Sequence, residues 1–264
     1  MRYFIACCTD EGRRKKGNQD SILVQRAVSG REQAVLAVLC DGMGGLDGMD
    51  MASASVVKAF SGWMEKELSR LRWTRKKKIF LALDRVLKKA DRRLRAYSGR
   101  YGLRMGTTAT VLLLFRGMYY IAHVGDSRVY ELGKKARQVT SDQTLVAEEV
   151  KRGLLTEEQA GNDPRRNILL QCVGGNGCIP EHICGTVKEG AVYLVCSDGF
   201  CHEISAEEMK DTFCPEQMQD EETLEERCRI LVERNLERGE RDNISVIAIR
   251  TEKERRNAGN RFGH

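Results

Sequence analysis

Three aspartates each stand beside a glycine at the end of an apolar segment. Asp41 follows AVLAVLC, Asp126 follows YYIAHVG and Asp198 follows AVYLVCS, while a fourth, Asp242, directly precedes NISVIAI. If these segments are buried strands that meet at one edge, their carboxylates repel one another unless cations lie between them. Carboxylate oxygens are the ligands that hard divalent cations prefer. The pattern therefore predicts a site for divalent metal ions, although each Asp-Gly pair taken alone is also an ordinary turn sequence.

Short apolar segments separated by turn residues supply the strands that would position these aspartates. We expect strands at 2–9, 20–28, 34–40, 107–115, 118–124, 127–132, 191–196 and 243–250, and helices at about 52–71, 75–97, 142–152, 205–213 and 221–237. Tight turns join the three strands between 107 and 132, which predicts that neighbours pair antiparallel. Residues 153–185 are irregular, and we interpret them as a surface flap. Because strands and helices cluster instead of alternating, the predicted class is α+β with antiparallel sheets.

The composition is that of a soluble globular protein. The 264 residues are 41% hydrophobic and 31% charged, which argues against a disordered chain. No apolar segment approaches the roughly 20 residues needed to span a bilayer, and the N-terminal MRYFIACCTD reads as a first strand instead of a signal sequence. We therefore expect a cytoplasmic protein with no membrane contact. No linker or repeat divides the chain, so we predict one domain over 1–250 and a polar, frayed tail over 251–264.

The ten cysteines are scattered and include no Cys-x-x-Cys pair, so neither a zinc ribbon nor a thioredoxin-like motif is supported. Cys40 and Cys196 lie inside apolar strands and are interpreted as small core residues. A regulatory thiol at Cys172, Cys178 or Cys201 stays open.

One segment, from Arg70 to Arg104, carries fourteen lysines and arginines against two aspartates, a net charge of +12 in a chain whose total is +6. Its apolar residues recur at helical spacing: Ile79, Leu83, Val86, Leu87, Ala90 and Leu94. Three interpretations stay open, namely a solvated helix face, a docking surface for an acidic protein, and a nucleic-acid site. Nucleic acid is the least favoured, because neither interleaved aromatic residues nor a known binding motif accompanies the charge.

As a set, several segments resemble the metal-dependent protein phosphatases of the 2C type (the PPM family), in particular the compact bacterial members. They are TDEGRRKKGNQDS (9–21), LCDGMGG (39–45), MGTTATVLL (105–113), VGDSRVY (124–130), TSDQTLV (140–146), CSDGF (196–200) and RDNISVI (241–247). The resemblance implies a four-layer α/β/β/α sandwich of two antiparallel sheets flanked by helices. It also implies hydrolysis of phosphoserine and phosphothreonine in proteins with Mn²⁺ or Mg²⁺, two or three ions per chain.

The resemblance also implies roles for individual residues. Asp41, Asp198 and Asp242 would be catalytic, with Asp41 bridging two metals. The further metal ligands would be Gly42 through its carbonyl oxygen, Asp20 and possibly Gln19 at the second metal, and Asp126 at a third. Paired cations that lower the pKa of a bridging water would supply the nucleophile, so no cysteine nucleophile is needed.

Two positions depart from the family pattern. Lys15 stands where most relatives have an arginine that binds the substrate phosphate, and Arg13 is a neighbour that could share the task. Because a lysine cannot form the bidentate contact of an arginine, we expect Lys15 to bind phosphate less tightly than an arginine would. Met43 stands where eukaryotic relatives have a histidine, which leaves the general acid unidentified. We interpret His123 as a core or edge histidine and His202 as peripheral.

Three functions follow from these observations. The leading hypothesis is an active phosphatase that acts on phosphoproteins, with a Ser/Thr kinase as one candidate partner. A pseudophosphatase that binds phosphoproteins without turnover is the first alternative, supported only by Lys15. A basic scaffold that binds nucleic acid through residues 70–104 is the second.

Overall fold

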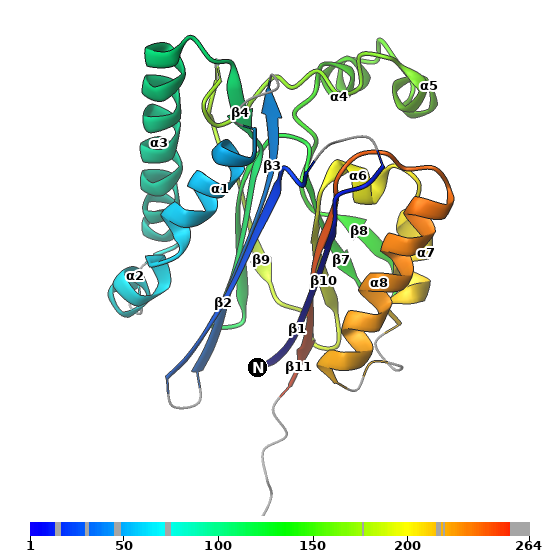
Figure 1. Cartoon of the computed structure of the whole chain (residues 1–264). Helices are drawn as coiled ribbons and strands as arrows, with labels where there is room; N and C mark the ends of the chain where they lie inside the picture. Colours follow the sequence, from blue (N-terminus) through cyan, green and yellow to red (C-terminus); the bar gives the residue numbers. More distant parts are fainter. Residues whose placement is uncertain are drawn as a thin grey trace, which may run out of the picture.

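The computed structural model describes residues 1–13, 17–29, 32–44, 49–71, 75–175, 177–214, 218 and 220–253. Within them, two antiparallel sheets stand face to face, and helices cover the outer face of each (Figure 1). This arrangement confirms the α+β class and the four-layer order predicted from the resemblance. No helix in the described part of the chain is both long and apolar enough to cross a membrane.

The first sheet has the order β2-β3-β5-β6-β9, with β4 paired to the end of β3. Its strands are β2 (Asp20–Ser29), β3 (Glu32–Gly44), β4 (Met105–Thr107), β5 (Ala109–Phe115), β6 (Met118–Val124) and β9 (Glu181–Thr186). The second sheet has the order β1-β11-β10-β7-β8. Its strands are β1 (Arg2–Asp10), β7 (Arg128–Leu132), β8 (Ala136–Gln138), β10 (Val192–Cys196) and β11 (Ile244–Glu252).

The helices divide between the two outer faces. On the first sheet lie α1 (Met49–Phe60), α2 (Trp63–Leu71) and α3 (Lys76–Tyr101), and on the second lie α6 (Asp198–Cys201), α7 (Ala206–Thr212) and α8 (Glu221–Glu237). Two short helices, α4 (Leu145–Lys151) and α5 (Glu157–Asn162), stand at one end of the molecule (Figure 1). The basic helix is amphipathic as predicted: Ile79, Leu83, Leu87, Ala90 and Leu94 of α3 are buried. Val86 is only partly buried.

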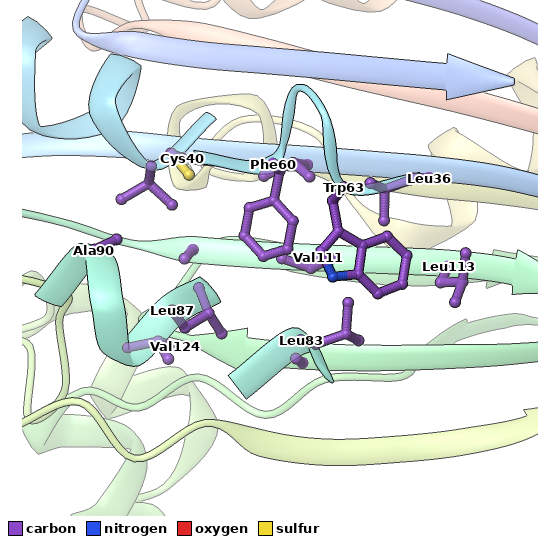
Figure 2. Close-up of a cluster of buried hydrophobic side chains, with 14 of the residues drawn as sticks. Leu36, Cys40, Phe60, Trp63, Leu83, Leu87, Ala90, Val111, Leu113 and Val124 are labelled. Carbon is purple, nitrogen blue, oxygen red and sulfur yellow. The ribbon is translucent and has the colours of Figure 1, made fainter. Parts of the chain in front are cut away.

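Strand β3 explains how one apolar run serves two cores. Val35, Ala37 and Leu39 belong to the core between the sheets. Leu36, Val38 and Cys40 alternate with them and pack under α1 and α3 beside Phe60 and Trp63 (Figure 2). A central strand covered on both faces needs apolar side chains at every position, because successive side chains point to opposite faces. Each fully buried aliphatic side chain contributes about 1.5–3 kcal/mol, so this burial fixes the position at which Asp41 emerges.

One predicted pairing is wrong. Residues 127–132 do not continue a meander with 118–124, because β7 pairs with β10 and β8 in the other sheet. Gly125 has φ +113°, and a Cβ there would lie 2.6 Å from the Thr108 side chain. The close approach and the backbone angle carry the chain across from the first sheet to the second at Asp126. A sequence of short apolar segments cannot distinguish this crossing from a hairpin.

Other elements differ in extent. The helix predicted at 52–71 is two helices that break at Ser61 and Gly62, and the strand predicted at 107–115 is interrupted at Thr108. The segment interpreted as irregular contains α5 and β9. A capping box between Thr156 and Gln159 was the overlooked signal for α5. Strand β11 runs to Glu252, and residues 254–264 lie outside the described residues.

Candidate metal centre

Asp20 and Asp41 lie directly opposite each other where β2 begins and β3 ends. They are register partners in the antiparallel pair. The N–H of Gly42 donates to the carbonyl of Gln19 at 3.1 Å, which fixes the two backbones together beyond this pair. Directly opposite residues project to the same face of a sheet, so the two carboxylates are neighbours. Burial and then the charges of Asp20 and Asp41 raise the pKa of the Cys40 thiol, which shows the negative potential that they create.

Hydrogen bonds tie Asp41 to the crossing that carries Asp126. The N–H of Asp41 donates to Thr108 Oγ1 at 2.9 Å, and the N–H of Thr108 donates to the Asp41 carbonyl at 2.9 Å. Thr108 Oγ1 lies 2.8 Å from the Oγ of Ser127, and Ser127 directly follows Asp126. Both hydroxyls are fully buried, so each bond is worth more than at the surface. The end of β3 is thereby fixed relative to the β6–β7 crossing.

Asp198 and Asp242 meet at the ends of the adjacent strands β10 and β11. The N–H of Ser197 donates to the Ser245 carbonyl at 3.0 Å. A Cβ on Gly199 would lie 2.3 Å from the Asn243 carbonyl oxygen and 3.4 Å from Asp242 Cβ. Only glycine permits so close an approach, so the turn that carries Asp198 packs against the residues that carry Asp242.

Asn243 joins this pair to the first sheet. Its Oδ1 accepts a hydrogen bond from the N–H of Gln19 at 2.9 Å, immediately before Asp20. Its Nδ2 donates to the Glu11 carbonyl at 2.7 Å. Together with the links from Thr108 and Gly199, these bonds place all five predicted aspartates around one end of the two sheets. These bonds and links connect Asp20, Asp41, Asp126, Asp198 and Asp242.

The electrostatics of this edge suit cations. Asp126 is 8% exposed, and its pKa is raised well above the usual value by burial first and then by the charges of Asp198 and Asp142. Gln19 Oε1 is buried and has no hydrogen-bond partner among the described residues. An all-oxygen donor set fits a hard divalent cation. Within the described residues, no three acidic, cysteine or histidine side chains form a preassembled metal cluster.

A cavity of about 270 Å³ opens beside Asp126 and Asp198. Its walls also include Arg128, Asp142, Cys201 and His202, and the segment after α5 contributes Arg166 and Asn167. Arg128 is committed to Asp142, to which its Nη2 donates at 2.7 Å. Arg166 is an exposed cation on the segment interpreted as a flap, and among the described residues its Nη1 donates to a backbone carbonyl, that of Gly161, at 3.1 Å. The cavity therefore combines the acidic edge with a guanidinium group suited to an anionic substrate.

His202 is not peripheral, and that interpretation was wrong. Its Nε2 lies 3.6 Å from Asp198 Oδ2, and its Nδ1 lies 2.9 Å from Glu240 Oε2. Burial opposes its charge, but Glu240 and Asp198 outweigh burial and raise the pKa of His202 to about 9. Glu240 Oε1 in turn accepts from the N–H of Asp242 at 2.8 Å. The pair therefore braces two of the aspartates, and the spacing of four residues from Asp198 across a helical turn was the available signal.

His123 is a core residue, in agreement with its interpretation. It is fully buried, and its Nδ1 lies 2.9 Å from Thr110 Oγ1. Burial lowers the pKa of His123 to about 4. Because the folded value lies below the unfolded value, the unfolded state binds more protons between the two, and stability falls as the pH falls from about 6.5 towards 4.

His123→Gln is expected to remove part of this acid sensitivity. Near pH 5 the buried neutral imidazole costs about 2 kcal/mol of stability relative to neutral pH, and a glutamine that keeps a polar contact to Thr110 carries no such cost. Urea unfolding of both proteins near pH 7 and near pH 5 measures the difference. An equal loss of stability on acidification in both proteins would show that the lowered pKa of His123 does not cause the acid sensitivity.

The loop after β1, which belongs to the family segment at 9–21 (the first motif), packs on Asp242. Gly12 has φ +67°, and a Cβ there would lie 2.0 Å from the Asp242 carbonyl oxygen. The N–H of Gly12 donates to Asp10 Oδ1 at 2.8 Å, which closes a tight turn. Arg13 is exposed directly after this turn, whereas Lys15 lies outside the described residues.

Cys196 and Cys201 lie next to the acidic edge, that is, the end of the two sheets that carries the five aspartates. Cys196 Sγ lies 3.4 Å from Cys201 Sγ and 3.6 Å from the Arg128 carbonyl oxygen. The contact with Cys196 and the charge of Arg128 lower the pKa of Cys201 against the effect of burial. Burial raises the pKa of Cys196.

Known proteins share both the sequence pattern and the fold. The family model of protein phosphatase 2C matches residues 9–239. Protein phosphatase PhpP of Streptococcus pneumoniae is 31% identical over 251 residues, which cover 93% of this chain and 96% of PhpP. The structure is similar to the S. agalactiae serine/threonine phosphatase, with a TM-score of 0.83, 28% identity, and coverage of 95% of this chain and 100% of that chain. It is also similar to the catalytic domain of the serine threonine protein phosphatase PstP in complex with two manganese ions, with a TM-score of 0.78, 26% identity, and coverage of 95% and 99%.

Proposed function

Because the chain belongs to the protein phosphatase 2C family, we propose that it hydrolyses phosphoserine and phosphothreonine in proteins with the help of two Mn²⁺ or Mg²⁺ ions. The class of enzyme, a metal-dependent protein serine/threonine phosphatase, follows from that membership. The observation that carries the proposal is the set of strand pairings, hydrogen bonds and close contacts that brings five aspartates from both sheets to one edge. When bound, paired divalent ions supply Lewis acidity that activates water and neutralises charge on the phosphoryl oxygens.

We assign the ligands on the family motif. Asp41 would bridge the two ions, Asp198 and Asp242 would hold the first, and Asp20 the second. Three further oxygens would complete the set: the Gly42 carbonyl, Gln19 Oε1 and, at a third and weaker ion, the Asp126 carboxylate. The raised pKa of Asp126 and the buried, unpartnered Gln19 Oε1 support these assignments, because a cation favours the charged carboxylate and fills the empty acceptor.

Other side chains at the site position the metal ligands and bind the substrate phosphate. The His202–Glu240 pair holds Asp198 and the backbone of Asp242, which keeps two ligands at a fixed separation. Arg166 in the cavity and Arg13 beside the acidic edge offer cationic groups to the substrate phosphate, and we place Lys15 with them on the family motif. The physiological substrate would be a phosphoprotein, and the activation segment of a Ser/Thr kinase is one candidate.

Arg166→Ala is expected to raise KM for a phosphothreonine peptide by about 10-fold, with a smaller change in kcat. A charge-assisted hydrogen bond to phosphate contributes about 1.5–3 kcal/mol, and this contact is made before the reaction step. Steady-state kinetics measure both constants. Arg165→Ala is the matched control, since Arg165 is exposed and pairs with Asp163 and Glu149 outside the cavity. An equal effect of the two substitutions would contradict the role of Arg166.

Turnover of a phosphothreonine peptide separates this proposal from the pseudophosphatase alternative. We expect release of inorganic phosphate with Mn²⁺, its loss in excess chelator, and its return when Mn²⁺ is restored. Binding of the peptide in calorimetry without phosphate release, at saturating Mn²⁺, would instead support a phosphoprotein-binding module.

A further inference from the structure

The thiols of Cys196 and Cys201 form a pair that neither the metal site nor the substrate needs. Cys196 ends β10 and is fully buried, while Cys201 ends α6 and is partly exposed. Their sulfur atoms are 3.4 Å apart. A disulfide requires about 2.05 Å, so an approach of about 1.4 Å is enough to join them. We propose that Cys196 and Cys201 form a reversible disulfide when the protein meets a hydroperoxide, and that this bond switches the phosphatase off.

Access favours Cys201 as the thiol that reacts first. It lines the cavity of about 270 Å³ beside Asp126 and Asp198, through which a small peroxide reaches the sulfur. Cys196 has no exposed surface and is reached only through its partner. Reaction with peroxide requires the thiolate of Cys201, because the thiolate is the nucleophilic form.

The chemistry balances with the hydroperoxide as oxidant. The Cys201 thiolate attacks one peroxide oxygen, the O–O bond breaks, and a sulfenic acid and one hydroxide (or alkoxide) ion form. The Cys196 sulfur then attacks the Cys201 sulfur, the S–O bond breaks, and hydroxide leaves and takes up the Cys196 proton as water. The two sulfurs together give two electrons to the O–O bond. A dithiol reductant reverses the change by thiol–disulfide exchange.

The bond encloses the residue on which the metal site depends. Asp198 lies between the two cysteines in the sequence, inside the loop that the disulfide would close. Cys196 is held in a strand paired on both sides, with β7 and β11, so the movement must come from the four-residue helix α6. That movement displaces Asp198 relative to Asp242, against which Gly199 is packed. A displacement of about 1 Å in a catalytic group lowers activity by about 10²-fold.

The effect on activity rests on the proposed function, but formation of the disulfide does not, so the experiment reads the two separately. The full chain is treated with hydrogen peroxide in the presence of chelator, the peroxide is removed, and Mn²⁺ is then restored for the assay. Mass spectrometry of the unreduced peptide that spans residues 189–210 is expected to show the loss of two hydrogens and protection of both thiols from alkylation. Phosphatase activity is expected to fall by about 10²-fold and to return with dithiothreitol.

Matched variants make each outcome decisive. Cys196→Ala is expected to keep the activity of the reduced protein and to form no disulfide, although its Cys201 is still oxidised. Cys201→Ser is expected to resist the peroxide, judged by its activity after treatment relative to its own activity before treatment. Cys172→Ser, which removes a partly exposed cysteine elsewhere, is expected to stay sensitive. Free thiols at both positions after treatment, or a sulfinic acid on Cys201 without the disulfide, would overturn the proposed site. A disulfide that forms without loss of activity would overturn the switch, and a protein inactive even when reduced would refute the phosphatase assignment alone.

Discussion

Asp41→Asn is expected to lower kcat for a phosphothreonine peptide by about 10³-fold or more. The residue is assigned as the bridge between two ions, and metal ions contribute several kcal/mol of transition-state stabilisation, at about 1.4 kcal/mol per tenfold in rate. An amide keeps the size of the side chain but removes the charge that holds cations. Asp198→Asn is expected to have an effect of similar size, because it removes a ligand of the first ion.

Steady-state kinetics at saturating Mn²⁺ measure this effect, with circular dichroism to confirm that the fold is retained. Asp211→Asn is the matched control, since that carboxylate is exposed on α7. We expect unchanged kinetics for the control. A decrease of less than about tenfold for Asp41→Asn would show that the bridging assignment is wrong.

Gly12→Ala is expected to lower activity by about 10²-fold and to destabilise the protein by about 1–3 kcal/mol. The new Cβ would lie 2.0 Å from the Asp242 carbonyl oxygen, and the φ of +67° is itself unfavourable for alanine. Backbone cannot move aside as a flexible side chain can, so either the first-motif loop or Asp242 must shift. Both parts belong to the proposed site, and activity should fall further than stability alone explains.

Gly117→Ala separates steric contact from backbone strain. Gly117 has φ +74° in the β5–β6 turn, and a Cβ there would meet no heavy atom within 4 Å. The control should therefore show the loss of stability due to φ alone, with phosphatase activity unchanged at a temperature where both variants are folded. Equal activity of the two variants would mean that the packing of Gly12 on Asp242 does not position the site.

The parts of the fold that sequence predicted well are those in which local pattern and burial agree. The stripe of Ile79, Leu83 and Leu87 defined α3, because a surface helix must bury one face. The apolar run before Asp41 defined β3, because both of its faces are covered. The crossing at Gly125 was missed, since the choice of sheet for β7 depends on partners in β10 that are at least 60 residues away.

The site divides in a similar way. Asp41, Asp126 and Asp198 were recognisable because a strand end next to glycine is visible in the sequence, and Asp242 because it directly precedes an apolar run. The family motif supplied Asp20 and the role of each aspartate. The spacing of His202 from Asp198 was visible in the sequence, but its contact with Glu240 was not, because that contact depends on how α6 meets the segment before β11. The contact of Cys196 with Cys201 depends on the same turn, and the sequence alone gave Cys196 the role of a core residue.

Anomalous diffraction at the manganese edge, from crystals of this protein grown with Mn²⁺, tests whether these aspartates hold paired divalent ions. We expect two strong peaks at the edge where the sheets meet, with Asp41 in contact with both and with Asp198 and Asp242 in contact with one. Crystals that show no peak at this edge, or peaks that touch none of these three carboxylates, would contradict this expectation.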